Sequence, residues 1–210
     1  MKKLLASAAL VLALAGCARD GQIGEGGVYV TRSGCPQVAI PAATGDITLF
    51  DPAGSSDARA IDVVATITNV RSTCTDEGGN VVSTATFDVV ATRRDSGAAR
   101  QVVLPFFAVA VQGGTNIIAK KVAAVALNFP AGSQRAQTNS QATARVSRAA
   151  VSLPADIQRE LTRPRKAGDA DAAVDPLADP RIRQAVASAT FEHLVGFQLT
   201  GEQLRYNATR

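Results

Sequence analysis

The stretch VVSTATFDVVAT, residues 81–92, decides the fold class of this chain because its apolar and polar positions alternate. Successive side chains of a strand point to opposite faces of a sheet, so alternation predicts a strand with one buried face. The many Val and Thr residues also disfavour a helix. We therefore expect a core-facing set made of Val81, Ser83, Ala85, Phe87, Val89 and Ala91.

Similar segments extend on both sides of this stretch, separated by turns rich in Gly, Asp, Asn and Ser. Gly permits the positive φ of tight hairpins, and Asp and Asn hydrogen-bond to the turn backbone. The expected strands are Val28–Thr31, Asp46–Phe50, Ala60–Thr73, Asn80–Arg93, Arg100–Gln112, Asn116–Phe129 and Gln141–Leu153. Seven strands at this spacing predict a mainly β fold, an antiparallel, immunoglobulin-like β-sandwich over residues 28–153.

The segment RQVVLPFFAVAVQ, residues 100–112, is apolar at both parities from Val102 to Val111. Such a strand is normally covered on both faces, and Pro105, which lacks an N–H, belongs at a bulge or an edge. Helices after Leu153 are the expected cover, because soluble proteins rarely expose large apolar patches. The alternative is an exposed surface for a partner or lipid, containing Phe106 and Phe107.

Residues 154–210 change in character and are expected to form a small α-helical extension that packs on the sandwich. Ile157 and Leu161 are spaced i,i+4 in a predicted helix over 154–162, and Asp179 and Pro180 have the pattern of a second helix start. Residues 163–178 between them have little to bury and predict a mobile loop. A strand over 190–199 and a short helix after a capping-box pair, Thr200 and Gln203, complete the extension.

Cys35 and Cys74 are an even pair that we expect to form a disulfide in an exported domain. Zinc binding is the first alternative, but the chain has a single His and no CxxC pair. Redox activity is the second, but redox sites favour Cys-X-X-Cys spacing.

The N-terminal sequence MKKLLASAALVLALAGC combines a positive start, a short apolar run and small residues before Cys17. The tetrad Leu14-Ala15-Gly16-Cys17 resembles the lipobox of bacterial lipoproteins. The resemblance implies a signal peptide over 1–16, cleavage before Cys17, lipid on that cysteine, and a flexible tether over 17–27. The alternatives are an ordinary cleaved signal with an incidental cysteine, or an anchor helix. For an anchor helix the apolar run is short of the ~20 residues that span a membrane.

The same resemblance implies a cell-envelope location, lipid-anchored and facing the periplasm. Ala18 rather than Asp follows the cysteine, which by lipoprotein sorting rules implies the outer membrane. Without residues 1–16 the chain has 20 basic and 18 acidic residues. Nucleic-acid binding requires a dense basic face, and this balanced charge predicts no nucleic-acid partner. We expect the membrane, contacted through the lipid, and an envelope protein or glycan as partners.

His193 is the only histidine, and no G-x-S-x-G, S-x-x-K or H-E-x-x-H motif accompanies it. We expect it to be packed within or at the edge of a strand. Asp169, Asp171 and Asp175 alternate as in a calcium loop but lack the Gly and terminal Glu of the EF-hand. No catalytic residue, cofactor or metal ligand is therefore assigned.

Arg93, Arg94, Arg145 and Arg148 are candidates for one basic face on adjacent strands. Such a face would suit an acidic glycan, lipid headgroups or a protein. The alternative is ordinary strand charges that discourage edge aggregation.

The sequence thus predicts a membrane-tethered, non-enzymatic binding or scaffolding module. The alternative is an envelope hydrolase or glycan-modifying enzyme that uses scattered carboxylates, which would require a cleft with paired acids.

Overall fold

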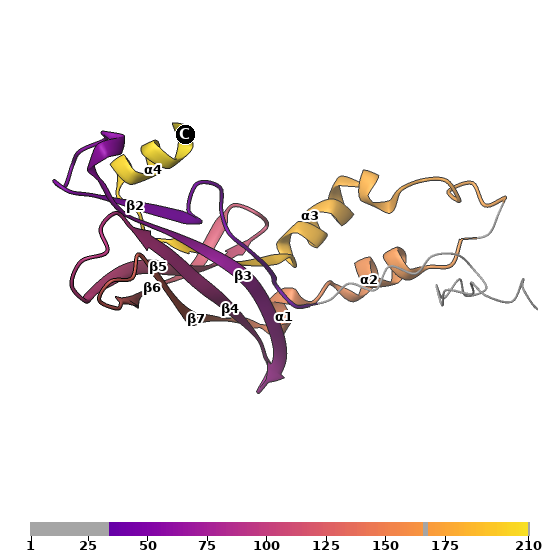
Figure 1. Cartoon of the computed structure of the whole chain (residues 1–210). Helices are drawn as coiled ribbons and strands as arrows, with labels where there is room; N and C mark the ends of the chain where they lie inside the picture. Colours follow the sequence, from indigo (N-terminus) through magenta and orange to yellow (C-terminus); the bar gives the residue numbers. More distant parts are fainter. Residues whose placement is uncertain (1–33, 166–167, 210) are drawn as a thin grey trace, which may run out of the picture.

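A computed structural model describes residues 34–165 and 168–209 of the chain and consists mainly of two packed sheets (Figure 1). The first sheet has the strand order β1-β8-β5-β6 and the second the order β2-β3-β4-β7. The strands are β1 (Gln37–Ala39), β2 (Asp46–Phe50), β3 (Ile61–Glu77), β4 (Asn80–Arg93), β5 (Arg100–Gln112), β6 (Asn116–Phe129), β7 (Arg135–Ser147) and β8 (Phe191–Phe197). The sequence therefore predicted the mainly β, two-sheet architecture correctly. The expected strand Val28–Thr31 lies outside the described residues.

The core lies between the two sheets and uses the predicted face of β4. Every residue of the set Val81, Ser83, Ala85, Phe87, Val89 and Ala91 is buried. Phe87 meets Phe106 of β5 edge-to-face, with the ring centroids 5.3 Å apart. Leu127 and Phe129 of β6 are also fully buried. Burial of these large apolar side chains is the main favourable contribution to the stability of the sandwich.

β7 begins and ends earlier than the sequence predicts. It pairs along the whole of β4, from Thr92 opposite Arg135 to Asn80 opposite Ser147. A one-turn helix, α1 (Arg148–Val151), takes the place of the expected end of the strand. The first half of β7 is polar, so its strand conformation comes from pairing with β4 rather than from an apolar pattern.

The C-terminal region contributes both to the sandwich and to a projecting arm. β8 lies inside the first sheet, parallel to β1 on one side and antiparallel to β5 on the other. α4 (Gly201–Thr209) begins with the predicted capping box: the Thr200 N–H donates to Gln203 Oε1 at 2.9 Å, and the Gln203 N–H donates to Thr200 Oγ1 at 3.2 Å. Asn207 joins α4 to the sandwich by donating to the carbonyls of Ala43 and Asp46.

The helical arm consists of α2 (Ala155–Thr162), α3 (Pro180–Ser188) and the described residues between them, 163–165 and 168–179, and it projects away from the sheets (Figure 1). The expectation that these helices cover the second face of residues 102–111 is therefore wrong at Val103 and Pro105. Val103 is 57% exposed and Pro105 is exposed, whereas Val109 and Val111 are buried.

Part of the outer face is covered by the segment between β1 and β2 instead. Thr44 of this segment lies so close to Gly196 of β8 that a Cβ there would be 2.4 Å from its hydroxyl and 2.9 Å from the Phe107 ring. Glycine at this position is what allows the segment to lie against the sheet. β5 has no such cover at Val103 and Pro105, and β6 is exposed from Asn116 to Ala124.

Among the described residues, no helix is both long and apolar enough to cross a bilayer.

Candidate interaction surface

The β5–β6 hairpin presents an apolar face outward, on the side opposite the core. The register pairs the outward residues of the two strands: Val103 with Ala126, Pro105 with Ala124 and Phe107 with Val122. Paired residues of neighbouring strands share a face, so these side chains form one continuous stripe.

Exposed aliphatic side chains gather on this hairpin. Val103 and Val122 are each 57% exposed, Ile117 is 63% exposed and Ile118 is 43% exposed. The remaining large exposed apolar residues of the described chain are dispersed: Val174, Leu177 and Leu204. A single exposed aliphatic residue needs no explanation, but a contiguous group of them marks an interaction site.

β6 is an edge strand, and from Asn116 to Ala124 all of its residues are exposed. Both faces of this half are therefore open. Uncovered edges of this length attract other strands, and proteins protect them with charges, especially lysine. Lys120 and Lys121 stand in the middle of this half.

Neither lysine is in an ion pair within the part of the chain that the structure describes. The Lys120 ammonium lies 5.3 Å from the centroid of the Phe107 ring, a cation–π contact. Between Ser96 and Ala155 the chain contains no Asp or Glu, while its basic residues there are Arg100, Lys120, Lys121, Arg135, Arg145 and Arg148. We call the set Val103, Pro105, Ile117, Ile118, Val122, Lys120 and Lys121 the β5–β6 surface. Val103, Pro105, Ile118, Lys120 and Val122 lie on its outer face, whereas Ile117 and Lys121 project from the opposite face of the exposed β6 edge.

Of the two phenylalanines proposed for a partner surface, only Phe107 reaches this face. Phe106 is 4% exposed and packs in the core against Phe87, so its assignment to a surface is wrong. Phe107 is half-buried under Lys120. Alternation along β5 separates the two rings onto opposite faces.

Arg93 is not a surface residue either. It is buried, lies 5.3 Å over the ring of Phe129, and its guanidinium donates to four backbone carbonyls. These acceptors belong to two loops: Gly97, Ala98, Pro130 and Ser133. Arg93 therefore ties the β4–β5 and β6–β7 connections together.

The other three arginines do not form one basic face. Arg145 is opposite Val82 at one end of β4, whereas Arg94 follows the last residue of that strand. Arg94 lies twelve residues beyond Val82 along the chain, roughly 40 Å for an extended strand. Arg145 pairs with Glu77 and Arg148 with Asp76, while Arg94 pairs with Asp95. The predicted face is thus divided between two ends of the molecule.

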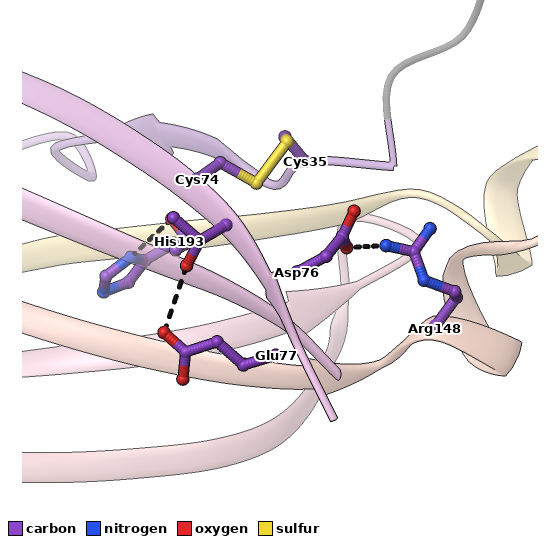
Figure 2. Close-up of a disulfide and its surroundings, with 8 residues drawn as sticks. Cys35, Cys74, Asp76, Glu77, Arg148 and His193 are labelled. Carbon is purple, nitrogen blue, oxygen red and sulfur yellow. Dashed lines mark hydrogen bonds and ion pairs between the residues drawn. A yellow bond between two sulfur atoms is a disulfide. The ribbon is translucent and has the colours of Figure 1, made fainter. Parts of the chain in front are cut away.

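The disulfide between Cys35 and Cys74 is present, with the two Cα atoms 6.0 Å apart (Figure 2). It joins the segment before β1 in one sheet to β3 in the other. Closing a loop across 39 positions restricts the unfolded chain and stabilises the fold by about 3–4 kcal/mol in the chain-entropy model. Cys17 lies outside the described residues.

His193 lies close to this disulfide but inside the core, as a packed histidine (Figure 2). Its Nδ1 is 3.1 Å from the hydroxyl of Ser83, and Cys74 is the register partner of Ser83. Burial lowers the pKa of His193. With no exposed surface, the Ser83–His193 pair is inaccessible to a substrate, so it has a structural role in this conformation.

A cleft of about 740 Å³ lies between α4 and residues 53–56. Its wall includes Tyr206, whose ring meets Phe50 edge-on at 5.2 Å, and Arg100, which binds Asp62 through two contacts of 2.8 and 2.6 Å. The hydrogen bond from Arg100 lowers the pKa of Asp62. A carboxyl group that acts as general acid needs a raised pKa, so Asp62 is poorly suited to that role.

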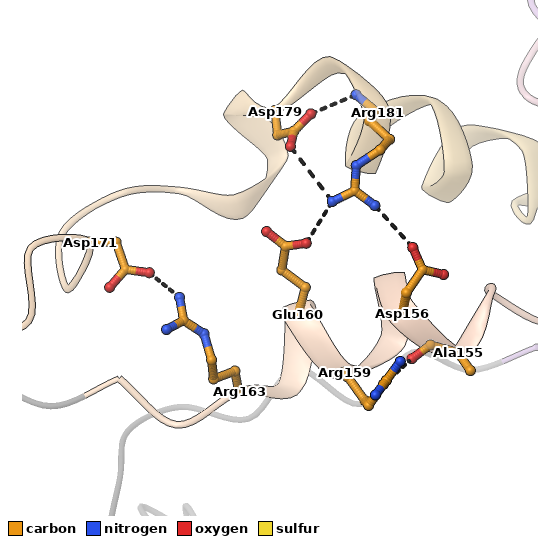
Figure 3. A network of polar contacts seen from close by, with 8 residues as sticks. All are labelled: Ala155, Asp156, Arg159, Glu160, Arg163, Asp171, Asp179 and Arg181. Atoms are coloured by element: carbon orange, nitrogen blue, oxygen red, sulfur yellow. Dashed lines mark hydrogen bonds and ion pairs between the residues drawn. The ribbon is translucent and has the colours of Figure 1, made fainter.

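Carboxylates of the helical arm are occupied in ion pairs (Figure 3). Arg181 of α3 reaches Asp156 at 3.1 Å and Glu160 at 2.6 Å, both on α2, and Arg163 pairs with Asp171. Asp175 and Asp179 accept hydrogen bonds from backbone N–H groups at helix starts. No cluster of three or more metal-ligating side chains occurs within residues 34–165 and 168–209.

No protein-family model, curated protein or solved structure matches this chain significantly.

Sequence reasoning missed the lysines and isoleucines of β6. The alternation of residues 121–129 predicts which of their side chains face the core. Residues 116–120 do not alternate, so their pattern does not assign any of them to a face. The long acid-free segment around them was a sequence feature able to reveal the site.

Proposed function

We propose that the chain is a lipid-anchored lipoprotein of the bacterial cell envelope, facing the periplasm from the outer membrane. In this role it is a non-enzymatic binding or scaffolding module. The lipobox resemblance at residues 14–17 supports the anchor. The observation that carries the binding role is the β5–β6 surface, which combines exposed aliphatic side chains with two exposed lysines that form no ion pair within the described residues.

The alternative, an envelope hydrolase or glycan-modifying enzyme, draws on the cleft beside α4. This cleft is large enough for a small ligand and contains the acids Asp62 and Glu202. Acid–base catalysis on a glycan needs one carboxyl group with a raised pKa, whereas Arg100 lowers that of Asp62. The cleft therefore supports the enzymatic alternative less well than the β5–β6 surface supports binding.

For the fold, we propose the immunoglobulin-like assignment within the β-sandwich class. Two facing four-stranded sheets, with the chain passing repeatedly between them, support this assignment.

Metabolic labelling with a palmitate analogue tests the anchor. The wild-type protein should become labelled and Cys17→Ser should not. Equal labelling of the two proteins would refute the lipoprotein assignment.

Site-specific photo-crosslinking in intact cells tests the binding role. A crosslinking residue at Val122, on the β5–β6 surface, should capture an envelope component. The same residue at Val174, which is 53% exposed on the helical arm, is the matched control and should give no such product. Absence of any Val122-specific adduct would remove the support for the binding proposal.

A further inference from the structure

The partner of the β5–β6 surface follows from its chemistry and its position. We propose that this surface docks on the anionic headgroups of the membrane that holds the lipid anchor. The inference rests on the proposed anchor at Cys17 and names the occupant that the binding role left open.

The side chains of the β5–β6 surface fit a lipid interface. Ile118, Lys120 and Val122 are exposed on the outer face of β6, and Ile117 and Lys121 are exposed on the opposite face of the same edge strand. The segment around them contains no acidic residue. Aliphatic groups insert at the headgroup boundary while lysines bind lipid phosphates. Glycan binding usually uses exposed aromatic rings, but the aromatic ring here, Phe107, is half-buried beneath Lys120.

The surface also lies at the end of the sandwich where the described chain begins. A Cβ on Gly34 would be 3.2 Å from the Val151 side chain, and Val151 shares a buried cluster with Ala110. Ala110 is the register partner of Ala119 in the exposed half of β6. The chain start and this half of β6 are therefore close to each other.

The tether length is compatible with contact between this end and the membrane. Gly34 follows Cys17 by seventeen residues. Even a fully extended chain of that length keeps the domain within roughly 60 Å of the lipidated cysteine. The tether is therefore long enough for β6 to contact the membrane that holds Cys17.

A second copy of the chain is a poorer occupant. Antiparallel pairing of β6 with its own copy around Lys120 and Lys121 would place a lysine of one copy opposite a lysine of the other on each face of the strand pair. Like charges placed opposite each other destabilise a strand pair. An anionic membrane surface attracts the ammonium groups of the same two lysines instead.

Hydrogen exchange on the reconstituted, lipidated full-length protein tests the proposal. The amides of residues 116–124 are followed by mass spectrometry in two vesicle types, pure phosphatidylcholine and phosphatidylcholine with one third phosphatidylglycerol. Two lysines near an anionic surface correspond to about a 30-fold gain in association. We expect these amides to exchange several-fold more slowly on anionic vesicles, and high salt to reverse the effect.

A charge-reversal pair provides the matched control. Lys120→Glu with Lys121→Glu should abolish the protection, while Arg94→Glu with Arg135→Glu, at the far end of β4, should preserve it. Equal exchange on both vesicle types, or equal protection in both double variants, overturns the proposal. A protein that fails to float with any vesicle indicates failure of the anchor, whereas flotation without protection of β6 indicates failure of the docking alone.

Discussion

Arg93 shows how a charged strand residue becomes part of the interior. Its position at the end of β4 directs it inward, where its guanidinium meets the carbonyls of two loops and the face of Phe129. A charge buried in this way is tolerated because its donors are satisfied, and removing them leaves the carbonyls without partners.

We predict that Arg93→Lys lowers the free energy of unfolding by about 2–4 kcal/mol, because an ammonium cannot donate to all four carbonyls. Urea denaturation measures the change. Arg94→Lys, at an exposed neighbouring position, is the control and should change stability by less than about 0.5 kcal/mol. Equal effects of the two substitutions would contradict the role assigned to Arg93.

His193 makes the stability of the fold depend on pH. Burial lowers its pKa from the ordinary value of 6.5, and Nε2 has no hydrogen-bond partner within the described residues. Below pH 6.5 the unfolded state therefore takes up a proton that the folded state resists, so stability falls with decreasing pH.

We predict that the free energy of unfolding falls by up to about 1.4 kcal/mol per pH unit below pH 6.5, down to the pKa of the folded state. Asp62, whose pKa is lowered, also contributes to stability in its ionised form, but that contribution is lost only as the pH falls below the ordinary pKa of 3.8. Urea titrations between pH 4.5 and 8 measure the slope. His193→Gln removes the single histidine and should flatten this part of the curve; an unchanged slope would assign the dependence to other groups.

At the scale of elements, the helical arm is held by few interactions. Ile157 and Ile182 are the buried side chains of α2 and α3, and the ion pairs of Arg181 connect the two helices. Arg181 is half exposed, so water screens its pairs and they contribute little. Apolar burial is the larger contribution.

We predict that Ile182→Ala unfolds the arm locally, with loss of hydrogen-exchange protection in α2 and α3, because each helix is too short to persist alone. The thermal midpoint of the sandwich should stay nearly unchanged. Arg181→Ala should weaken protection of the arm by less than about 1 kcal/mol. A larger effect from Arg181→Ala than from Ile182→Ala would contradict this ranking.

For the whole molecule, folding depends on β8, because this strand lies in the interior of the first sheet. Val195 and Phe197 are fully buried, and the strand pairs with β1 and β5. The arm stands between β7 and β8 in sequence, yet its two ends come together, since Val151 and Phe191 share one buried cluster.

We predict that replacing residues 155–188 with a short Gly-Ser linker leaves a cooperatively folded sandwich, whereas ending the chain after Leu153 abolishes folding. The first change removes only the arm, and the second removes a central strand and its core residues. Circular dichroism melting compares the two proteins. A folded protein ending at Leu153 would show that β8 is dispensable.

The sequence alone determined the elements that depend on local patterns. Alternation predicted the core face of β4, capping residues predicted the starts of α3 and α4, and the cysteine count predicted the disulfide. These patterns act between neighbours in the chain or reflect burial of a single face, so they can be read without knowledge of the partners.

Only the tertiary structure decided where each face of a strand would lie. Residues 102–111 are apolar at both parities, and nothing local distinguishes a covered outer face from an open one. Three features of the tertiary structure decide which parts are open: the direction of the arm, the position of Thr44 over Gly196 and the exposure of residues 116–124 of β6. Arg93 became interior and Lys120 stayed exposed for the same reason: burial depends on which distant segments pack against a residue.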